Sequence, residues 1–302
     1  MKTVEISAQE LKAWLDKKKD FLLIDVLPPE YYNEKHIAGA VSAPVYEVIF
    51  LEYVEKLTDN KRKTIVVYNE SEDSLSTTDA AIKLKKAGYE NVFEFSGGLA
   101  KWEAVGYPIE KGNVVEIPII IDGKYEIDTE NSVVGWIGRN AKYAHHGKIT
   151  IKSGGLIVKD KNIVGGDIVL DMTTIKDDDL KDDALRSVLE THLKSSDFFD
   201  VENYPEALFK FDSVEKIKAA RAGTPNFIIS GLLTIKELAN PIEFPAMIVP
   251  MEDGVINGQA HFDFDRTLWD VHYGSEKFFE KLGMHLVNDM VSLELFLIAK
   301  LR

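Results

Sequence analysis

The sequence contains no cysteine among its 302 residues. Disulfide bonds, thiolate metal sites, iron–sulfur clusters and cysteine nucleophiles are therefore all excluded. Basic residues are also scarce, because 36 Lys and Arg stand against 50 Asp and Glu, which gives a net charge of −14. A chain of this charge has no basic face for phosphate groups, so we expect neither nucleic acid nor an anionic membrane surface as a partner.

Long apolar segments are missing as well. No run reaches the roughly 18 apolar residues that a membrane-spanning helix needs, and the first seven residues lack the apolar core of a signal peptide. We expect no membrane span and a cytoplasmic location, or a periplasmic one where a signal segment has been removed. The length favours two domains.

Strands and helices alternate over the first 112 residues. Ser7 and Glu10 have the spacing of a capping box at the start of a helix. Apolar runs at 21–24, 64–68 and 92–95 are typical of strands buried in a parallel sheet, so the pattern predicts an α/β domain. Functional residues in such sheets usually lie beyond the carboxyl ends of the strands, which points to the polar loop 69–76.

The segments 23–26, 36–40, 66–68, 88–92 and 97–102 carry a resemblance to a known family. On these segments, residues 4 to about 111 resemble the rhodanese-like family. In that family the residue after the strand that ends here at Tyr68 is a cysteine, which carries a persulfide. This sequence has Asn69 at that position.

The asparagine changes the chemistry that the resemblance implies. An amide is neither a nucleophile nor a sulfur carrier, so we predict no sulfurtransferase activity and a scaffold or docking role. Three acids in the loop, Glu70, Glu72 and Asp73, stand without a loop Lys or Arg and oppose capture of an anion. The candidate residues of this degenerate loop are Asp25, Asn69, Glu70, Ser71, Ser74, Ser76 and Thr77.

The pattern changes near residue 112, and we place one domain at 1–112 and the other at 113–302. Alternation with period two dominates the second part, as at 260, 262 and 264 and at 291, 293, 295, 297 and 299. Turn signals such as Gly154-Gly155 and Asp253-Gly254 separate these runs. About eight strands joined by short turns predict an all-β antiparallel barrel.

Two helical segments interrupt the strand pattern. Leu185, Val188, Leu189 and Leu193 fall on one face of a helix that begins near Asp182. A second short helix is expected around Phe278 and Phe279, ending near Gly283. We expect both helices to plug or flank the barrel.

Residues 192–201, 231–236, 265–267 and 273–279 carry a second resemblance. On these, residues from about 122 to 302 resemble the YceI-like lipid-binding family. The resemblance implies a lipocalin-type barrel that binds a polyisoprenoid, and each buried CH₂-sized unit would contribute ~0.8 kcal/mol. We expect a hydrophobic small molecule of the isoprenoid, quinone or fatty-chain type and no other cofactor.

Candidate lining residues of the barrel are the aromatic side chains of its inward-facing positions. Each is also compatible with plain core packing, because small barrels are commonly filled by side chains. They are Trp136, Phe209, Phe211, Phe262, Phe264, Trp269, Tyr273, Phe278 and Phe279.

Several histidines and acidic residues have side chains that can bind a metal ion. His145 and His146 are adjacent, so on a strand they face opposite ways. His261 and Asp263 share a face, but two ligands do not make a site. The acidic run from 177 to 183 lacks the glycine and glutamate of an EF-hand and is interpreted as a solvated loop. We predict no metal site.

The sequence thus predicts a carrier or sequestering protein that holds an apolar molecule in its barrel beside a catalytically silent rhodanese-like domain. Two alternatives stay open. One is an interaction or regulatory module whose barrel is filled by side chains, and the other is an enzyme that uses the rhodanese loop without cysteine. A homo-oligomer is compatible with either.

Overall fold

The computed structural model describes residues 4–114 and 116–302. Contacts within the chain separate two units, Met1–Ile117 and Pro118–Arg302. The change of sequence pattern predicts this boundary slightly earlier, after residue 112. Among the described residues, no helix combines the length and the apolar character that crossing a bilayer requires.

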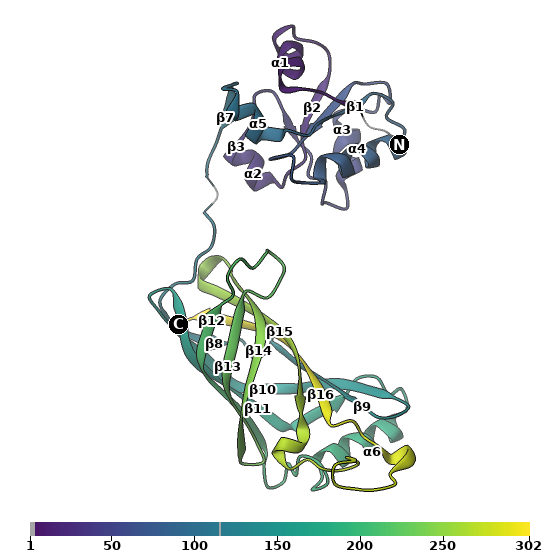
Figure 1. Cartoon of the computed structure of the whole chain (residues 1–302), viewed down its shortest axis with the longest axis vertical. Coiled ribbons are helices and arrows are strands. Elements are labelled where there is room, and N and C mark those ends of the chain that lie inside the picture. Colours follow the sequence, from purple (N-terminus) through teal and green to yellow (C-terminus); the bar gives the residue numbers. More distant parts are fainter. Residues whose placement is uncertain (1–3, 115) are drawn as a thin grey trace. The chain divides into compact units, whose positions relative to one another are not determined.

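The N-terminal unit is built on a five-stranded sheet in which every neighbouring pair of strands is parallel (Figure 1). The strand order is β1-β6-β5-β2-β4. These strands are β1 (Val4–Glu5), β2 (Leu22–Asp25), β4 (Val41–Ser42), β5 (Ile65–Tyr68) and β6 (Val92–Phe95). The predicted parallel α/β domain is confirmed.

Helices cover both faces of this sheet. They are α1 (Ala8–Asp16), α2 (Pro29–Glu34), α3 (Phe50–Leu57), α4 (Ser76–Lys86) and α5 (Gly98–Ala104), and a small antiparallel pair, β3 (Lys35–Ile37) and β7 (Ile109–Lys111), lies beside them. The central strand β5 is buried along its whole length, and its alternate residues belong to two different core clusters. Burial on both faces explains the unbroken apolar run in the sequence. The predicted capping box is present, since Glu10 N–H donates to Ser7 Oγ and Ser7 N–H to Glu10 Oε2.

The C-terminal unit is a closed antiparallel barrel of nine strands that occupy eight positions. Two strands share one position, because β8 (Gly123–Ile127) and β9 (Val133–Arg139) both pair with β10 (Ala144–Lys159) and β16 (Met290–Leu301). The other strands are β11 (Asn162–Asp177), β12 (Glu206–Lys216), β13 (Phe227–Ile235), β14 (Leu238–Pro250) and β15 (Val255–Asp265). Pairing of β10 with β11 closes the ring. The predicted all-β barrel is confirmed.

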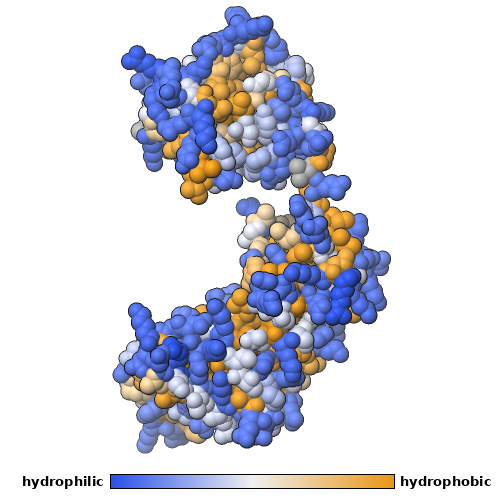
Figure 2. Space-filling view, turned by 180° about the vertical axis from the view of Figure 1, so that it is seen from behind, coloured by the Kyte–Doolittle hydropathy of each residue, from blue (hydrophilic) through white to orange (hydrophobic). Residues whose placement is uncertain are grey.

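The alternating pattern of the strands separates the inside of the barrel from its outside. In the register of β15 and β16, Phe262 pairs with Leu293 and Ala260 with Leu295, and all four side chains pack against the barrel core. Figure 2 shows mixed hydrophilic and hydrophobic residues on the visible outer surface, as expected where every second side chain points outward.

One helix, α6 (Asp183–Lys194), interrupts the strands between β11 and β12. It begins as predicted, since Asp182 Oδ1 accepts hydrogen bonds from the backbone of residues 184 and 185. Leu189 and Leu193 pack against the barrel core, whereas Leu185 and Val188 are 59% and 67% exposed. Only part of the predicted apolar face is therefore covered within this unit.

The second predicted helix is wrong. Residues 274–280 form turns, and only the short 3-10 helix η3 (Gly283–His285) follows them. Lys281 and Gly283 have positive φ values of 58° and 52°, which a right-handed helix does not tolerate. Two other 3-10 helices, η1 (Glu252–Gly254) and η2 (Arg266–Trp269), flank β15.

The interruption between β8 and β9 is held by polar contacts to β16. Asp128 N–H donates to Ile298 O at 2.8 Å, and Ile298 N–H donates to Ser132 Oγ at 2.9 Å, so the backbone of β16 stays hydrogen-bonded across the gap. Asp128 Oδ2 also lies 2.6 Å from Lys300 Nζ. The bond to Lys300, followed by that to Asn131, lowers the pKa of Asp128 to about 2.

This pKa predicts a pH dependence of stability. Because the folded pKa is below the ordinary value near ~4, the contribution of Asp128 is complete above about pH 5 and is lost as the pH falls towards 2. We expect Asp128→Asn to lower the urea midpoint at neutral pH, with a difference from the unaltered protein that shrinks steadily as the pH falls from about 5 to about 2. Asp160→Asn, at an exposed turn, is the control. A difference that is the same at every pH would contradict the assignment.

Candidate functional site

The first residue of the loop after β5, Asn69, forms hydrogen bonds with other residues of the same loop. Asn69 is fully buried, and its Nδ2 donates to Ser76 Oγ at 3.0 Å and to Ser74 O at 3.3 Å. Ser74 Oγ and Ser76 Oγ share a further bond of 2.9 Å. The side-chain amide thus fills the position at which the rhodanese-like family carries its sulfur, and Thr77 beside it is buried as well.

The start of α5 supports this loop from the other side. Leu99 N–H donates to Asn69 O and Ala100 N–H to Glu70 O, each at 2.8 Å. Gly98 makes this approach feasible, because it has a φ of +60° and a Cβ there would lie 2.5 Å from Asn69 O. The loop is therefore retained as a structure although its cysteine is absent.

Two acids of the predicted loop set differ in their surroundings. Asp25 is buried at the end of β2, and burial raises its pKa, although its Oδ1 accepts from Leu27 N–H at 2.9 Å. Glu70 is exposed and lies 3.7 Å from Lys35 Nζ, which also bonds Glu103 at 2.7 Å. The loop itself contains no basic residue, but the fold brings Lys35 beside it. Ser71 is half-buried.

The barrel contains a cavity of about 320 Å³ at the end that α6 covers. In Figure 1, α6 and the yellow segment before β16 lie at this same end, away from the C-terminus. Most of the wall is aliphatic or aromatic and comes from strands on all sides of the barrel, including Ile149, Leu170, Met172, Ala207, Leu233, Phe264 and Leu293. The cavity is therefore suited to an apolar molecule.

Polar side chains contribute to the same cavity. Arg139, Asn140, His145, His192, Arg266 and Tyr273 all line it. They come from β9 and the start of β10, from α6, and from η2 and the segment after it. An apolar ligand with one polar end would find hydrogen-bonding groups here.

A second, smaller cavity of about 90 Å³ lies in the other core cluster of the barrel. Phe209 and Phe211 line it, and stacked aromatic rings stand where the two core clusters meet. The ring centroids of Phe209 and Phe244 are 5.6 Å apart, and those of Phe244 and Phe262 are 4.1 Å apart. Phe209 packs against both core clusters, so this group of rings lies at their junction.

The predicted lining residues divide into three groups. Trp136, Phe264 and Tyr273 line the larger cavity, and Phe209 and Phe211 line the smaller one. Phe262 and Trp269 line neither; Phe262 is a core residue, and the fully buried Trp269 donates its Nε1–H to Leu233 O at 2.8 Å. Phe278 and Phe279 were predicted wrongly, since they are 50% and 48% exposed.

The exposure of these two phenylalanines has a local cause. The turn that replaces the predicted helix directs them away from the barrel, and the Phe278 ring stacks on His272 with centroids 3.7 Å apart. The buried charged residue Arg266, at the start of η2, lines the cavity instead.

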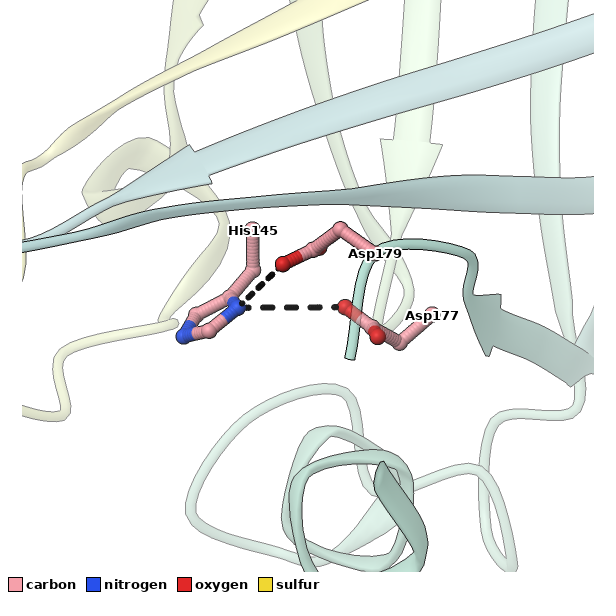
Figure 3. Close-up of side chains that lie close together, drawn as sticks. All are labelled: His145, Asp177 and Asp179. Atoms are coloured by element: carbon pink, nitrogen blue, oxygen red, sulfur yellow. Dashed lines mark hydrogen bonds and ion pairs between the residues drawn. The ribbon is translucent and has the colours of Figure 1, made fainter. Parts of the chain in front are cut away.

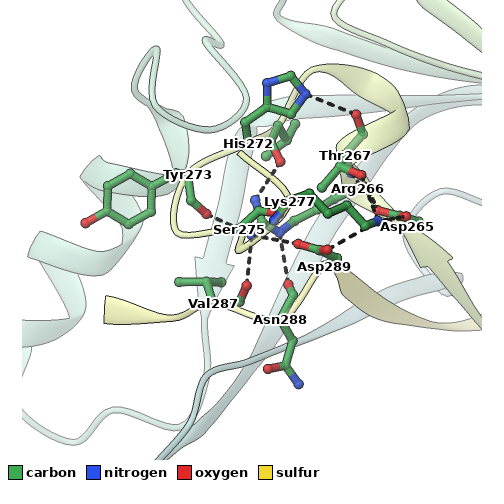
Figure 4. Close-up of polar contacts among 11 residues, drawn as sticks. Asp265, Arg266, Thr267, His272, Tyr273, Ser275, Lys277, Val287, Asn288 and Asp289 are labelled. Atoms are coloured by element: carbon green, nitrogen blue, oxygen red, sulfur yellow. Dashed lines mark hydrogen bonds and ion pairs between the residues drawn. The ribbon is translucent and has the colours of Figure 1, made fainter. Parts of the chain in front are cut away.

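Arg266 organises the segment that closes this end of the barrel. Its guanidinium donates to the carbonyl oxygens of residues 271, 273, 287 and 288 at 2.6 to 3.1 Å (Figure 4). Only 2% of its surface is exposed, and burial lowers its pKa. Asp289 lies 3.8 Å away, and Lys277 joins Asp289 to Asp265. One cation thus connects both ends of the closing segment.

The acidic run was also interpreted wrongly in one respect. Asp177 is buried rather than solvated, and it lies with Asp179 beside His145 (Figure 3). His261, in contrast, is exposed and 3.6 Å from Glu294, while Asp263 accepts a hydrogen bond from Ser292. The spacing of residues in the sequence did not predict the first group, because its histidine lies more than thirty positions from both aspartates.

Comparison with known proteins assigns both units. The YceI-like domain model matches residues 125–299, more than half of the chain. The chain belongs to the YceI-like family. Its N-terminal unit is a rhodanese-like domain, since that model matches residues 7–105.

The known proteins described next are each similar to one of the two units of this YceI-like protein. Thiosulfate sulfurtransferase GlpE of Coxiella burnetii is 34% identical over 95 residues, which are 31% of this chain and 83% of that protein. Burkholderia cenocepacia BcnA is 18% identical and covers 58% of this chain and 99% of its own, with a TM-score of 0.46. A polyisoprenoid binding domain from Saccharophagus degradans is 13% identical, with 59% and 98% covered and a TM-score of 0.44.

Restoring the cysteine tests what is left of the rhodanese-like loop. We expect Asn69→Cys to give thiosulfate sulfurtransferase activity roughly a hundredfold below that of a single-domain thiosulfate sulfurtransferase, because the loop acids repel the anionic donor. Asn69→Ser is the matched control for the lost amide. Activity of Asn69→Cys within about tenfold of that enzyme would show that the anion site is intact.

The role of Arg266 predicts a loss of stability. We expect Arg266→Met to lower the free energy of unfolding by ~2–4 kcal/mol, because several carbonyl oxygens lose their donors. The free energy of unfolding of Arg266→Lys should lie between those of the unaltered protein and Arg266→Met. The matched control is Arg302→Met, which removes an exposed pair with Glu126 and should cost less than about 1 kcal/mol. Equal losses in urea unfolding would contradict the organising role.

Proposed function

We propose that this YceI-like protein sequesters one elongated apolar molecule, of the polyisoprenoid or quinone type, in its barrel. The observation that carries this proposal is the cavity of about 320 Å³, which is lined mainly by apolar side chains and also by several polar groups. The rhodanese-like domain then serves as a scaffold, because its loop is filled by Asn69 and the chain has no cysteine to carry sulfur.

Exclusion of water from the ligand supplies the binding energy in this proposal. Each CH₂-sized unit that moves from water to the apolar wall contributes ~0.8 kcal/mol, so affinity grows with the length of chain that fits. The aromatic rings of Phe209, Phe244 and Phe262 would limit that length, since they belong to the core that adjoins the larger cavity. A ligand longer than the larger cavity has to displace them.

The polar end of the ligand has two sets of partners in this cavity. On one wall, Arg139 donates to Ser292 Oγ at 2.8 Å and so holds its guanidinium in place. On the other, the rings of His192 and Tyr273 meet edge to face with centroids 4.5 Å apart. A quinone carbonyl or an isoprenoid phosphate could accept hydrogen bonds from such groups.

The first experiment is mass spectrometry of an organic extract from full-length protein purified without detergent. We expect one apolar molecule in near-stoichiometric amount. A protein that is empty after purification is then loaded with a decyl-tailed benzoquinone, which should quench the fluorescence of Trp136 in the cavity wall.

A cavity-filling variant localises the binding. Ala207 lines the larger cavity, so Ala207→Phe should weaken quinone binding at least about tenfold while the barrel stays folded. Ala239→Phe makes the same change at an exposed position of β14 and should leave binding unaltered. An empty extract together with failed loading would refute the carrier proposal and favour an interaction module.

A further inference from the structure

Three side chains that can bind a metal ion, and that have no part in the proposed function, lie where the end of β11 meets the start of β10. His145 Nδ1 is 3.1 Å from Asp179 Oδ2 and 3.9 Å from Asp177 Oδ2. One ligand atom from each of the three residues lies within 4.8 Å of the others. Figure 3 shows both carboxylates directed at the same ring nitrogen.

One oxygen of this group is buried without a partner. The Asp177 side chain has no exposed surface, and its Oδ1 accepts from Leu180 N–H at 2.8 Å. Its Oδ2, the atom that faces His145, has no hydrogen-bond partner. Leaving a buried acceptor unsatisfied is costly, so an oxygen in this position, beside two other ligand atoms, favours a bound cation.

The charge balance points to a cation. Among the residues that the structure describes, no Lys or Arg pairs with Asp177 or Asp179; Lys148 instead lies 3.5 Å from Asp178. Two carboxylates are therefore opposed only by imidazoles.

Backbone N–H groups donate to the outward oxygen of each carboxylate and so hold both side chains in place. His146 N–H donates to Asp179 Oδ1 at 2.8 Å, which leaves Oδ2 directed at His145. Asp177 N–H donates to Glu190 Oε1 of α6 at 3.1 Å. Orientation of ligands by such outer bonds is characteristic of built metal sites.

We propose that His145 Nδ1, Asp177 Oδ2 and Asp179 Oδ2 bind a divalent transition metal ion, with Zn²⁺ as the preferred occupant. In tetrahedral zinc sites with bonds near 2.1 Å, ligand atoms stand about 3.4 Å apart, and the distances of 3.1 and 3.9 Å lie on either side of that value. An imidazole nitrogen in the set disfavours Ca²⁺ and Mg²⁺, which prefer oxygen ligands. Three protein ligands leave one position of the ion free.

The proposed ion would connect the barrel wall to the segment that leads into α6. His145 belongs to β10 and lines the larger cavity, whereas Asp179 lies in the loop before α6. Binding an ion to the folded state alone stabilises that state, so Zn²⁺ should raise the melting temperature of the protein. This inference does not depend on what the barrel holds.

The test is a Zn²⁺ titration of full-length protein that has been treated with a chelator, followed by calorimetry and by thermal melting. We expect one Zn²⁺ per chain, and at least about tenfold weaker binding of Ca²⁺ and Mg²⁺. His145→Ala and Asp179→Asn should each weaken Zn²⁺ binding by about 100-fold or more and abolish the shift in melting temperature.

Controls separate the site from a general effect of histidine loss or of unfolding. His261→Ala removes an exposed histidine 3.6 Å from a glutamate and should leave Zn²⁺ affinity unchanged. Asp177→Asn keeps the shape of the buried side chain and its bond to Leu180, and it should weaken Zn²⁺ binding as Asp179→Asn does. Zn²⁺ binding that is absent, or equal in the unaltered protein and in folded His145→Ala, would overturn the proposal.

Discussion

The closed end of the barrel depends on one buried guanidinium. Between η2 and β16 the chain forms turns and a single short 3-10 helix, so its carbonyl groups lack the regular partners that a strand or long helix would supply. Arg266 replaces those partners with a planar set of donors that reaches both sides of the segment. The cavity therefore has an ordered covering without regular secondary structure there.

The features that could be predicted from the sequence are those set by residues close together in the chain. Period-two alternation identified the barrel, and apolar runs identified the parallel sheet, because burial on one or both faces of a strand directly shapes local composition. The capping residues Ser7 and Asp182 were equally local signals. The turn around Phe278 was missed, because the spacing of Phe278, Phe279 and Leu282 resembles a helix face, whereas the backbone at Lys281 and Gly283 excludes a helix.

The candidate sites were harder to predict, because they are assembled across the fold. The sequence around Glu70 does not indicate that Lys35 lies beside it. The adjacency of His145 and His146 likewise argued against their binding one metal ion. In the structure Asp179 reaches both histidines, one with each carboxylate oxygen. The burial of Asp177 was equally hidden, since a run of aspartates has the composition of a solvated loop.

The shared position of β8 and β9 has a consequence for the order of folding. Both pieces pair with β16, so the barrel wall stays open until a strand more than 150 residues further along has been made. Contacts this distant in sequence are slow to form. The rhodanese-like domain has all its strands by residue 111, so during synthesis it can fold while the barrel is still an unclosed sheet with two free edges.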